Sequence, residues 1–296
     1  MLALSVVLGV LSAIVYGTST VVQYSAVHDG SGSTDARGLL RLLKNPQWLF
    51  TVAGDGVGFL LQVGALSTGP VVLIQPLVVL TLPVALIVAF FWRHARPTAG
   101  DYLGVAAVVA GLTVFLLMVS KPGKPKVPDP WAAGAAVVVL TIIGGGICLA
   151  IRNAPRLLRC AVYGGIAGSC FGTLGVLVNT ISHRIEDHGF SNVITSPGAI
   201  VDLVGMALLG ITGVVLTQLS YQIGVLGATL PASLTCEPGV AVILGVILLD
   251  ERIPHSPVAF VIYGLCLVAI VAGAIRLVEP ATSGRRVPEP GPLGAA

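Results

Sequence analysis

The chain has 296 residues, of which 55% are hydrophobic and only 10% are charged, and its formal net charge is +3. About 25% of the residues of a soluble domain are charged, so this composition excludes a soluble globular protein. The small positive charge gives no indication of nucleic-acid binding.

Nine apolar stretches are long enough to cross a bilayer, which takes about 20 mostly apolar residues. They lie at about 3–26, 47–67, 70–92, 101–119, 131–151, 158–181, 199–221, 226–249 and 257–277. Strands of membrane barrels alternate apolar and polar residues over about 10 positions, whereas the stretch from Val71 to Phe91 is apolar on every face apart from isolated polar positions. We therefore predict an all-α membrane protein with about nine transmembrane helices.

The distribution of basic residues predicts the orientation of these helices. With nine spans, eleven of the 16 Lys and Arg residues lie on one side of the membrane and the remaining five on the other. The richer side is expected to be cytoplasmic. We predict a multi-pass protein of the cytoplasmic membrane, with the N-terminus outside and the C-terminus cytoplasmic. The Gly/Ala/Val-rich composition suggests a high-GC bacterium.

An offset of 155 residues aligns the two halves of the chain, because it places Pro76 on Pro231 and Pro83 on Pro238. Spans one to four would then match spans six to nine, and the intervening linker helix would invert the second repeat. Inverted repeats are a common plan of secondary transporters, although a duplicated bundle without transport activity is the alternative. The predicted division is a first repeat at 1–120, a linker helix and loops at 121–157, a second repeat at 158–278 and a disordered tail at 279–296.

Two acidic residues lie deep in predicted spans. Asp55 is about nine residues into the second span, and Glu237 is about twelve residues into the eighth. A charged side chain at a helix centre costs about 2.5–3.5 kcal/mol on insertion scales. One or both carboxyls are therefore expected to bind a cation or a coupling proton. The alternative is that each is protonated and hydrogen-bonded to a neighbouring helix.

Other polar residues and prolines at membrane depth complete the candidate site. The residues expected to line a cavity are Gln62, Gln75, Gln218, Tyr16 and Tyr221. The residues expected to break helices, and so expose backbone groups to substrate, are Pro76, Pro83, Pro231 and Pro238. A pure packing role for these prolines is the other interpretation.

The sequence has no phosphate-binding loop, no nucleophile elbow and no zinc signature. We therefore expect neither an enzyme nor a bound cofactor. The expected partners are the lipid bilayer and a small-molecule or cation substrate, with no nucleic acid, and a homodimer is possible.

Short motifs in both halves resemble the drug/metabolite transporter superfamily. They are Gly64-Ala-Leu-Ser-Thr-Gly-Pro70, Gln75-Pro76, Tyr102-Leu-Gly104, Ala110-Gly-Leu112, Gly227-Ala-Thr-Leu-Pro231, Glu237-Pro238, Gly245-Val-Ile-Leu-Leu-Asp-Glu-Arg252 and Tyr263-Gly264. The resemblance implies a secondary transporter that moves a small solute or metabolite by alternating access between two inverted repeats.

Within that superfamily, the nine-span plan is similar to the NIPA-type magnesium transporters. Their second-span pattern resembles Trp48, Gly54-Asp55 and Gly58-Phe59, with Asp in place of the family's Glu and Gly58 in place of its Asn. This alternative makes the chain a magnesium or divalent cation transporter with Asp55 as its metal ligand. A further alternative is a non-transporting membrane partner or scaffold, in which Asp55→Asn and Glu237→Gln would be neutral in any transport assay.

Overall fold

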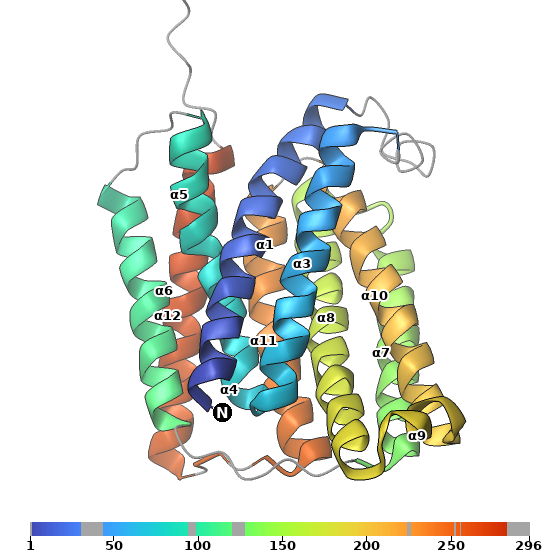
Figure 1. Cartoon of the computed structure of the whole chain (residues 1–296). Helices are drawn as coiled ribbons and strands as arrows, with labels where there is room; N and C mark the ends of the chain where they lie inside the picture. Colours follow the sequence, from blue (N-terminus) through green and yellow to red (C-terminus); the bar gives the residue numbers. More distant parts are fainter. Residues whose placement is uncertain are drawn as a thin grey trace, which may run out of the picture.

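The computed structural model describes residues 2–30, 44–93, 99–119, 128–223, 226–251, 253–254 and 256–282. These residues form an all-helical protein, and no strand occurs among them. The expected fold class is confirmed at this level. Figure 1 shows the helices running roughly alongside one another in a single bundle.

In its described residues, the amino-terminal half contains five helices and a 3₁₀ segment. They are α1 (Leu2–Gly30), α3 (Pro46–Thr68), α4 (Val71–Ile74), the 3₁₀ helix η1 (Gln75–Leu80), α5 (Thr81–Arg93) and α6 (Ala99–Met118). The start of α3 follows from local chemistry. The Asn45 side chain accepts hydrogen bonds from the backbone N–H groups of Gln47 and Trp48, and Pro46 occupies the first turn, where its missing N–H costs nothing.

The rest of the chain contains six helices within the described residues. They are α7 (Pro130–Ala150), α8 (Arg156–His188), α9 (Phe190–Thr195), α10 (Pro197–Ile223), α11 (Leu226–Leu249) and α12 (Pro257–Thr282). Helix α12 extends to Thr282, so it includes the first four residues of the predicted tail at 279–296. Except at Pro280, the N–H groups of this last turn can bond to carbonyls of the apolar helix before it. Residues 283–296 lie outside the described part of the chain.

Eight stretches of the described helices are long and apolar enough to cross a membrane. The predicted span at 101–119 forms α6, whose apolar part, Tyr102–Met118, is shorter than the other eight. Large apolar side chains such as Leu60, Ile142 and Ile211 are exposed on the outside of the bundle. Such a surface fits contact with lipid and supports a multi-pass membrane protein.

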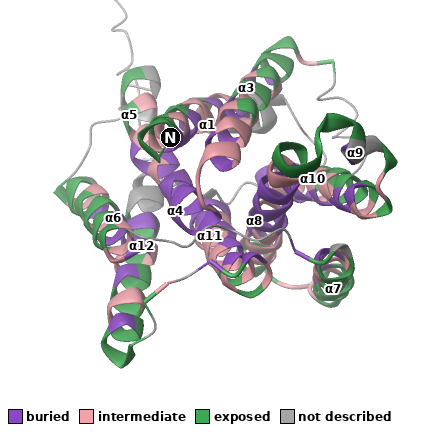
Figure 2. Cartoon of the chain, turned by 60° about the horizontal axis from the view of Figure 1, so that its bottom comes forward, coloured by how far each residue is buried: buried purple, intermediate pink, exposed green. Residues whose placement is uncertain are grey.

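The centre of the bundle is formed by α8 and α11. In the most apolar window of α8 67% of the residues are buried, compared with 17% in α7. Figure 2 shows this difference, with α8 and α4 largely buried in the middle and α7 exposed at the edge. Helix α1 packs on α3, α8 packs on α10 and α11, and α6 packs on α12.

The predicted third and eighth spans differ in continuity. The third is interrupted, because α4 changes at Gln75 into η1 and then at Thr81 into α5, with Pro76 in the first turn of η1. The eighth is one helix, α11, which runs uninterrupted through Pro231 and Pro238. The helix is therefore interrupted near Pro76, and Pro83 lies in the first turn of α5. The breaks predicted at Pro231 and Pro238 do not occur, because α11 continues through both.

Candidate functional site

Asp55 projects from α3 and is held by side chains of α1. Gln23 Nε2 donates a hydrogen bond of 3.0 Å to Asp55 Oδ2, and the Ser19 side chain also bonds to this carboxyl. The neighbouring Gly54 permits this approach, because a Cβ there would lie 2.6 Å from Ser19 Oγ. Two polar groups of α1 thus compensate part of the cost of a carboxyl at membrane depth.

Glu237 projects from α11 into the same interior region and is only 7% exposed. The Gln62 side chain on α3 hydrogen-bonds to the Glu237 carboxyl. Gln62 Nε2 also donates to Gln75 Oε1 at 3.2 Å. The Glu237 carboxyl of one half of the chain is therefore bound by one amide of the other half, that of Gln62.

Tyr16 on α1 is close enough to both carboxyls to feel their charge. It interacts electrostatically with both Glu237 and Asp55. Its ring packs over Gly58, where an added Cβ would lie 3.1 Å from the ring carbons. Ser12 Oγ donates to the Gly58 carbonyl at 2.8 Å and fixes α1 against α3 at this level.

We use the name central row for the polar side chains joined by these hydrogen bonds and electrostatic interactions. Its members are Gln23, Asp55, Tyr16, Glu237, Gln62 and Gln75. At its end, Gln75 is completely buried, and its Nε2 has no hydrogen-bond partner among the described residues. That amide lies directly against Gly175 of α8, where any Cβ would overlap it.

Two predicted site residues lie elsewhere. Trp48 Nε1 donates a hydrogen bond of 3.3 Å to Gln218 Oε1. Tyr221 is buried with Trp48, Leu230 and Leu234 in an apolar cluster. The structure thus brings Asp55, Glu237, Gln62, Gln75 and Tyr16 together and places Gln218 and Tyr221 in a separate group around Trp48.

Two buried acidic residues were not predicted from the sequence. Asp202 begins the second turn of α10, and its Oδ2 is 3.2 Å from Nε of Arg184 on α8. Glu251 follows α11 and accepts two backbone hydrogen bonds from α4. Burial raises the pKa of the Glu251 carboxyl, and those two hydrogen bonds oppose the shift. Both acids lie at the ends of spans, where acidic side chains are usually exposed to water. The sequence alone therefore did not indicate that they are buried.

Asp55 is the metal ligand expected under the magnesium alternative. Among the described residues, no group of three or more His, Cys, Asp or Glu side chains is arranged to hold a metal ion. The five cysteines are all free thiols.

A bacterial protein aligns with nearly the whole length of the chain. The chain is 25% identical over 284 residues to an uncharacterized protein of Corynebacterium glutamicum, and the alignment covers 94% of this chain and 96% of the relative. That organism is a high-GC bacterium. No protein-family model matches the chain, and no solved structure matches it.

Proposed function

We propose that this chain is a secondary transporter of the drug/metabolite type, which moves a small solute across the cytoplasmic membrane by alternating access. The observation that carries the proposal is the central row. Two carboxyls at membrane depth, Asp55 and Glu237, belong to one set of polar side chains that are linked by hydrogen bonds and electrostatic interactions. Ionisable residues in such positions mark substrate or proton paths.

A repeat of two inverted four-helix units, joined by α7, is supported by the helix boundaries. Shifted by 155 residues, α3 at 46–68 overlaps α10 at 197–223, and the third span at 71–93 overlaps α11 at 226–249. Equivalent pairs also pack together, since α1 contacts α3 and α8 contacts α10. Transporters built from such repeats bind substrate near the midplane between the repeats, which is where Gln62 of α3 meets Glu237 of α11.

The chemistry of the central row favours exchange of a proton or cation against the solute. An ionised carboxyl needs compensation in an apolar interior. Gln23 and Ser19 supply it for Asp55, and Gln62 supplies it for Glu237. A proton or a cationic solute that neutralises a carboxyl releases these amides, which can then bind polar groups of a cargo. Hydrated magnesium is the alternative cargo, because it is commonly held by one or two carboxylates and water.

Flux into proteoliposomes tests the proposal. Vesicles containing purified protein are loaded with magnesium-sensitive and pH-sensitive dyes. They are challenged with magnesium alone and then with fractions of a bacterial metabolite extract. The variants are Asp55→Asn and Glu237→Gln, and the control is Thr18→Val. Thr18 is exposed and donates to its own helix at the Ile14 carbonyl, away from the central row.

We expect at least one solute fraction to drive proton movement through the parent protein and the control, and both carboxyl variants to fall to the level of empty vesicles. Magnesium entry that Asp55→Asn abolishes would select the magnesium alternative. Folded parent protein that moves nothing, with carboxyl variants indistinguishable from it, would replace the proposal with the non-transporting partner.

A further inference from the structure

The connection between α3 and α4 is a tight corner at one end of the bundle. It consists of Gly69 and Pro70 and joins the end of α3 to the start of α4. In Figure 1 this corner lies at the same end as the N-terminus. A helix end exposes backbone groups that have no partner within the helix. At this corner the carbonyls at the end of α3 and the N–H groups at the start of α4 both need partners.

Glu251, from the other half of the chain, supplies the acceptors. Its Oε1 accepts from the Val71 N–H at 2.8 Å and its Oε2 from the Val72 N–H at 2.7 Å. The side chain is only 2% exposed. Hydrogen bonds to an ionised carboxylate are about twice as strong as neutral ones. A single residue beyond α11 therefore holds the start of α4.

Asn179, on α8, supplies the donors. Its Nδ2 donates to the Leu66 carbonyl at 2.7 Å and to the Gly69 carbonyl at 3.3 Å. Asn179 is completely buried. The two sides of the corner are thus bound by two residues of the carboxyl-terminal half, and each of these residues makes two hydrogen bonds.

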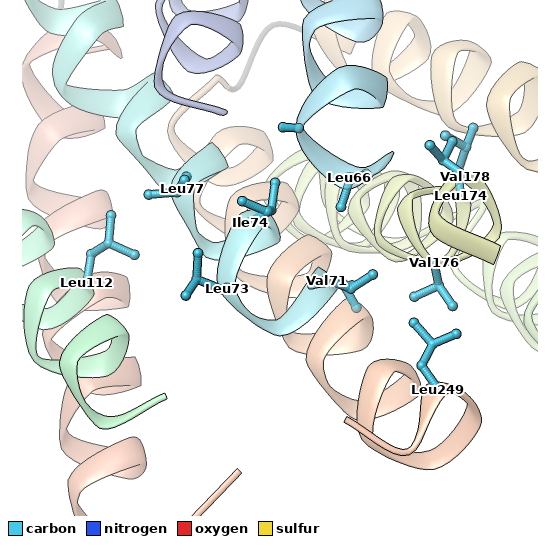
Figure 3. Close-up of a cluster of buried hydrophobic side chains, with 12 residues drawn as sticks. Leu66, Val71, Leu73, Ile74, Leu77, Leu112, Leu174, Val176, Val178 and Leu249 are labelled. Carbon is cyan, nitrogen blue, oxygen red and sulfur yellow. The ribbon is translucent and has the colours of Figure 1, made fainter. Parts of the chain in front are cut away.

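An apolar cluster surrounds these polar contacts. Leu66 and Val71 of the corner belong to the same buried cluster as Val176, Val178 and Leu249. Figure 3 shows Val71 facing Val176 and Leu249. Side chains from both halves therefore fill this end of the bundle around the corner.

The corner is connected to the central row by one turn of helix. Helix α4 comprises four residues and leads directly to Gln75, whose Oε1 accepts from Gln62, which in turn bonds to Glu237. At Gln75 the helix changes to the 3₁₀ segment η1. Such a segment inside a span has poorer hydrogen-bond geometry and often marks a hinge. A structural change at Glu237 can therefore reach the corner through Gln62, Gln75 and the four residues of α4.

We propose that the α3–α4 corner is a gate that closes one end of the transport path, that Glu251 and Asn179 hold it shut, and that η1 is its hinge. This inference rests on the proposed transport function. By the distribution of basic residues, the gated end is external. Release of the two holding residues lets the corner move away from α8 and α11 and admits water and solute to the central row.

Thiol labelling tests the gate without knowledge of the cargo. The five cysteines (Cys148, Cys160, Cys170, Cys236 and Cys266) are replaced by alanine, and Tyr16→Cys places one reporter thiol in the central row. A membrane-impermeant maleimide is added to whole cells and, separately, to inside-out vesicles. Glu251→Gln removes the charge at nearly constant side-chain volume, and Asn179→Leu removes both donor bonds with a larger, apolar side chain. Asp202→Asn is the control, since Asp202 is also a buried acid near this end but pairs with Arg184 outside the corner.

We expect the labelling rate from the external side to rise about tenfold in Glu251→Gln and Asn179→Leu, which corresponds to about 1.4 kcal/mol. Asp202→Asn should label at the parent rate. If Glu251→Gln fails to fold, Glu251→Asp replaces it, because Asp keeps the charge on a shorter side chain. Its labelling rate is then compared with that of Asn179→Leu.

Unchanged labelling in the folded variants of both residues would overturn the gate and leave Glu251 and Asn179 as helix-capping residues. This result is distinguishable from failure of the transport proposal. A gate that opens to maleimide in a protein that moves no solute would contradict the proposed function alone.

Discussion

The two halves of the chain pack a corresponding pair of helices in different ways. In the carboxyl-terminal half, three glycines of α8 lie directly on carbonyl oxygens of α11, so that an added Cβ would collide with backbone. The pairs are Gly164 with Thr229, Gly168 with Ser233, and Gly172 with Glu237. In the amino-terminal half, a Cβ at Gly9 of α1 would lie 2.9 Å from a side-chain atom, Leu77 Cδ1, and position 13 already carries a Cβ as Ala13. At Gly17 an added Cβ would meet a backbone atom, the Thr81 carbonyl oxygen, at 2.8 Å, so one of the three positions has a backbone contact.

The difference in contacts predicts which of the two helix pairs moves more easily. Backbone contacts at successive turns of α8 fix α11 as one continuous helix despite its two internal prolines. The third span contacts α1 through side chains in part, and it is interrupted by η1. Side chains can change rotamer, whereas two backbones in contact cannot. We therefore expect α8 and α11 to act as the fixed frame and α4 and η1 to be the moving part.

The largest expected effect comes from breaking the fixed frame. Gly168→Ala places a Cβ against the Ser233 backbone, and α8 and α11 must then separate. Overpacking costs about 1–3 kcal/mol or more, which exceeds the helix-propensity gain of about 1 kcal/mol for Ala over Gly. The melting temperature in detergent, followed by size-exclusion chromatography, should fall by many degrees.

Gly9→Ala is the control in the other half, because position 13, which corresponds to Gly168, is already alanine. Position 9 corresponds to Gly164 at the offset of 155 residues, but its obstacle is the mobile end of Leu77. We expect a small change in melting temperature, of either sign. Equal losses for Gly168→Ala and Gly9→Ala would show that the two halves are packed with the same rigidity.

A second test removes the space that Gln75 occupies. Gly175→Ala places a Cβ on the Gln75 amide, which has to leave its position and weaken its hydrogen bond to Gln62. Because the obstacle is the end of a side chain, the protein should fold, with a smaller fall in melting temperature than Gly168→Ala. Flux of the solute identified in proteoliposomes should nevertheless drop most of the way to background.

In the double variant Gly175→Ala/Gln75→Ser, the shorter Ser side chain leaves room for the added Cβ. We expect this variant to recover the melting temperature of the parent protein but not its flux. A Gly175→Ala protein with normal flux would remove Gln75 from the functional part of the central row.

Much of this arrangement was predictable from the sequence, and the rest was not for identifiable reasons. Apolar length and composition predicted the helices, and the cost of burying charge selected Asp55 and Glu237. Neither property depends on how the helices are placed relative to one another. The sequence therefore could not show that Gln62 and Gln75 join the central row. It also could not show that Gln218 bonds to Trp48 instead. Glu251 was missed because an acidic residue after a span normally meets water, and only the folded corner at α4 gives it buried donors.

A third test compares the two matched prolines, Pro76 and Pro231. Pro76→Ala restores a backbone donor at the start of η1 and lets the third span continue as a regular helix. We expect slower transport with no loss of thermal stability, because a straighter span moves less readily. Pro231 lies in a helix that is already continuous, so Pro231→Ala should leave the transport rate close to that of the parent protein. A greater loss of rate in Pro231→Ala than in Pro76→Ala would move the hinge to α11.

The smallest expected effect concerns the Trp48–Gln218 contact. Trp48→Phe removes a single side-chain hydrogen bond of 3.3 Å between α3 and α10. Side-chain hydrogen bonds between membrane helices contribute about 0.6 kcal/mol on average, and the Phe ring still fills the apolar cluster with Tyr221 and Leu234. The melting temperature should therefore change by a degree or two, and external maleimide labelling of the Tyr16→Cys reporter should stay at the parent rate. Labelling as fast as in Glu251→Gln would show that the contact at Trp48 restrains the α3–α4 corner as strongly as the four hydrogen bonds at the corner itself. The corner would then be no more important for closure than other contacts between the halves.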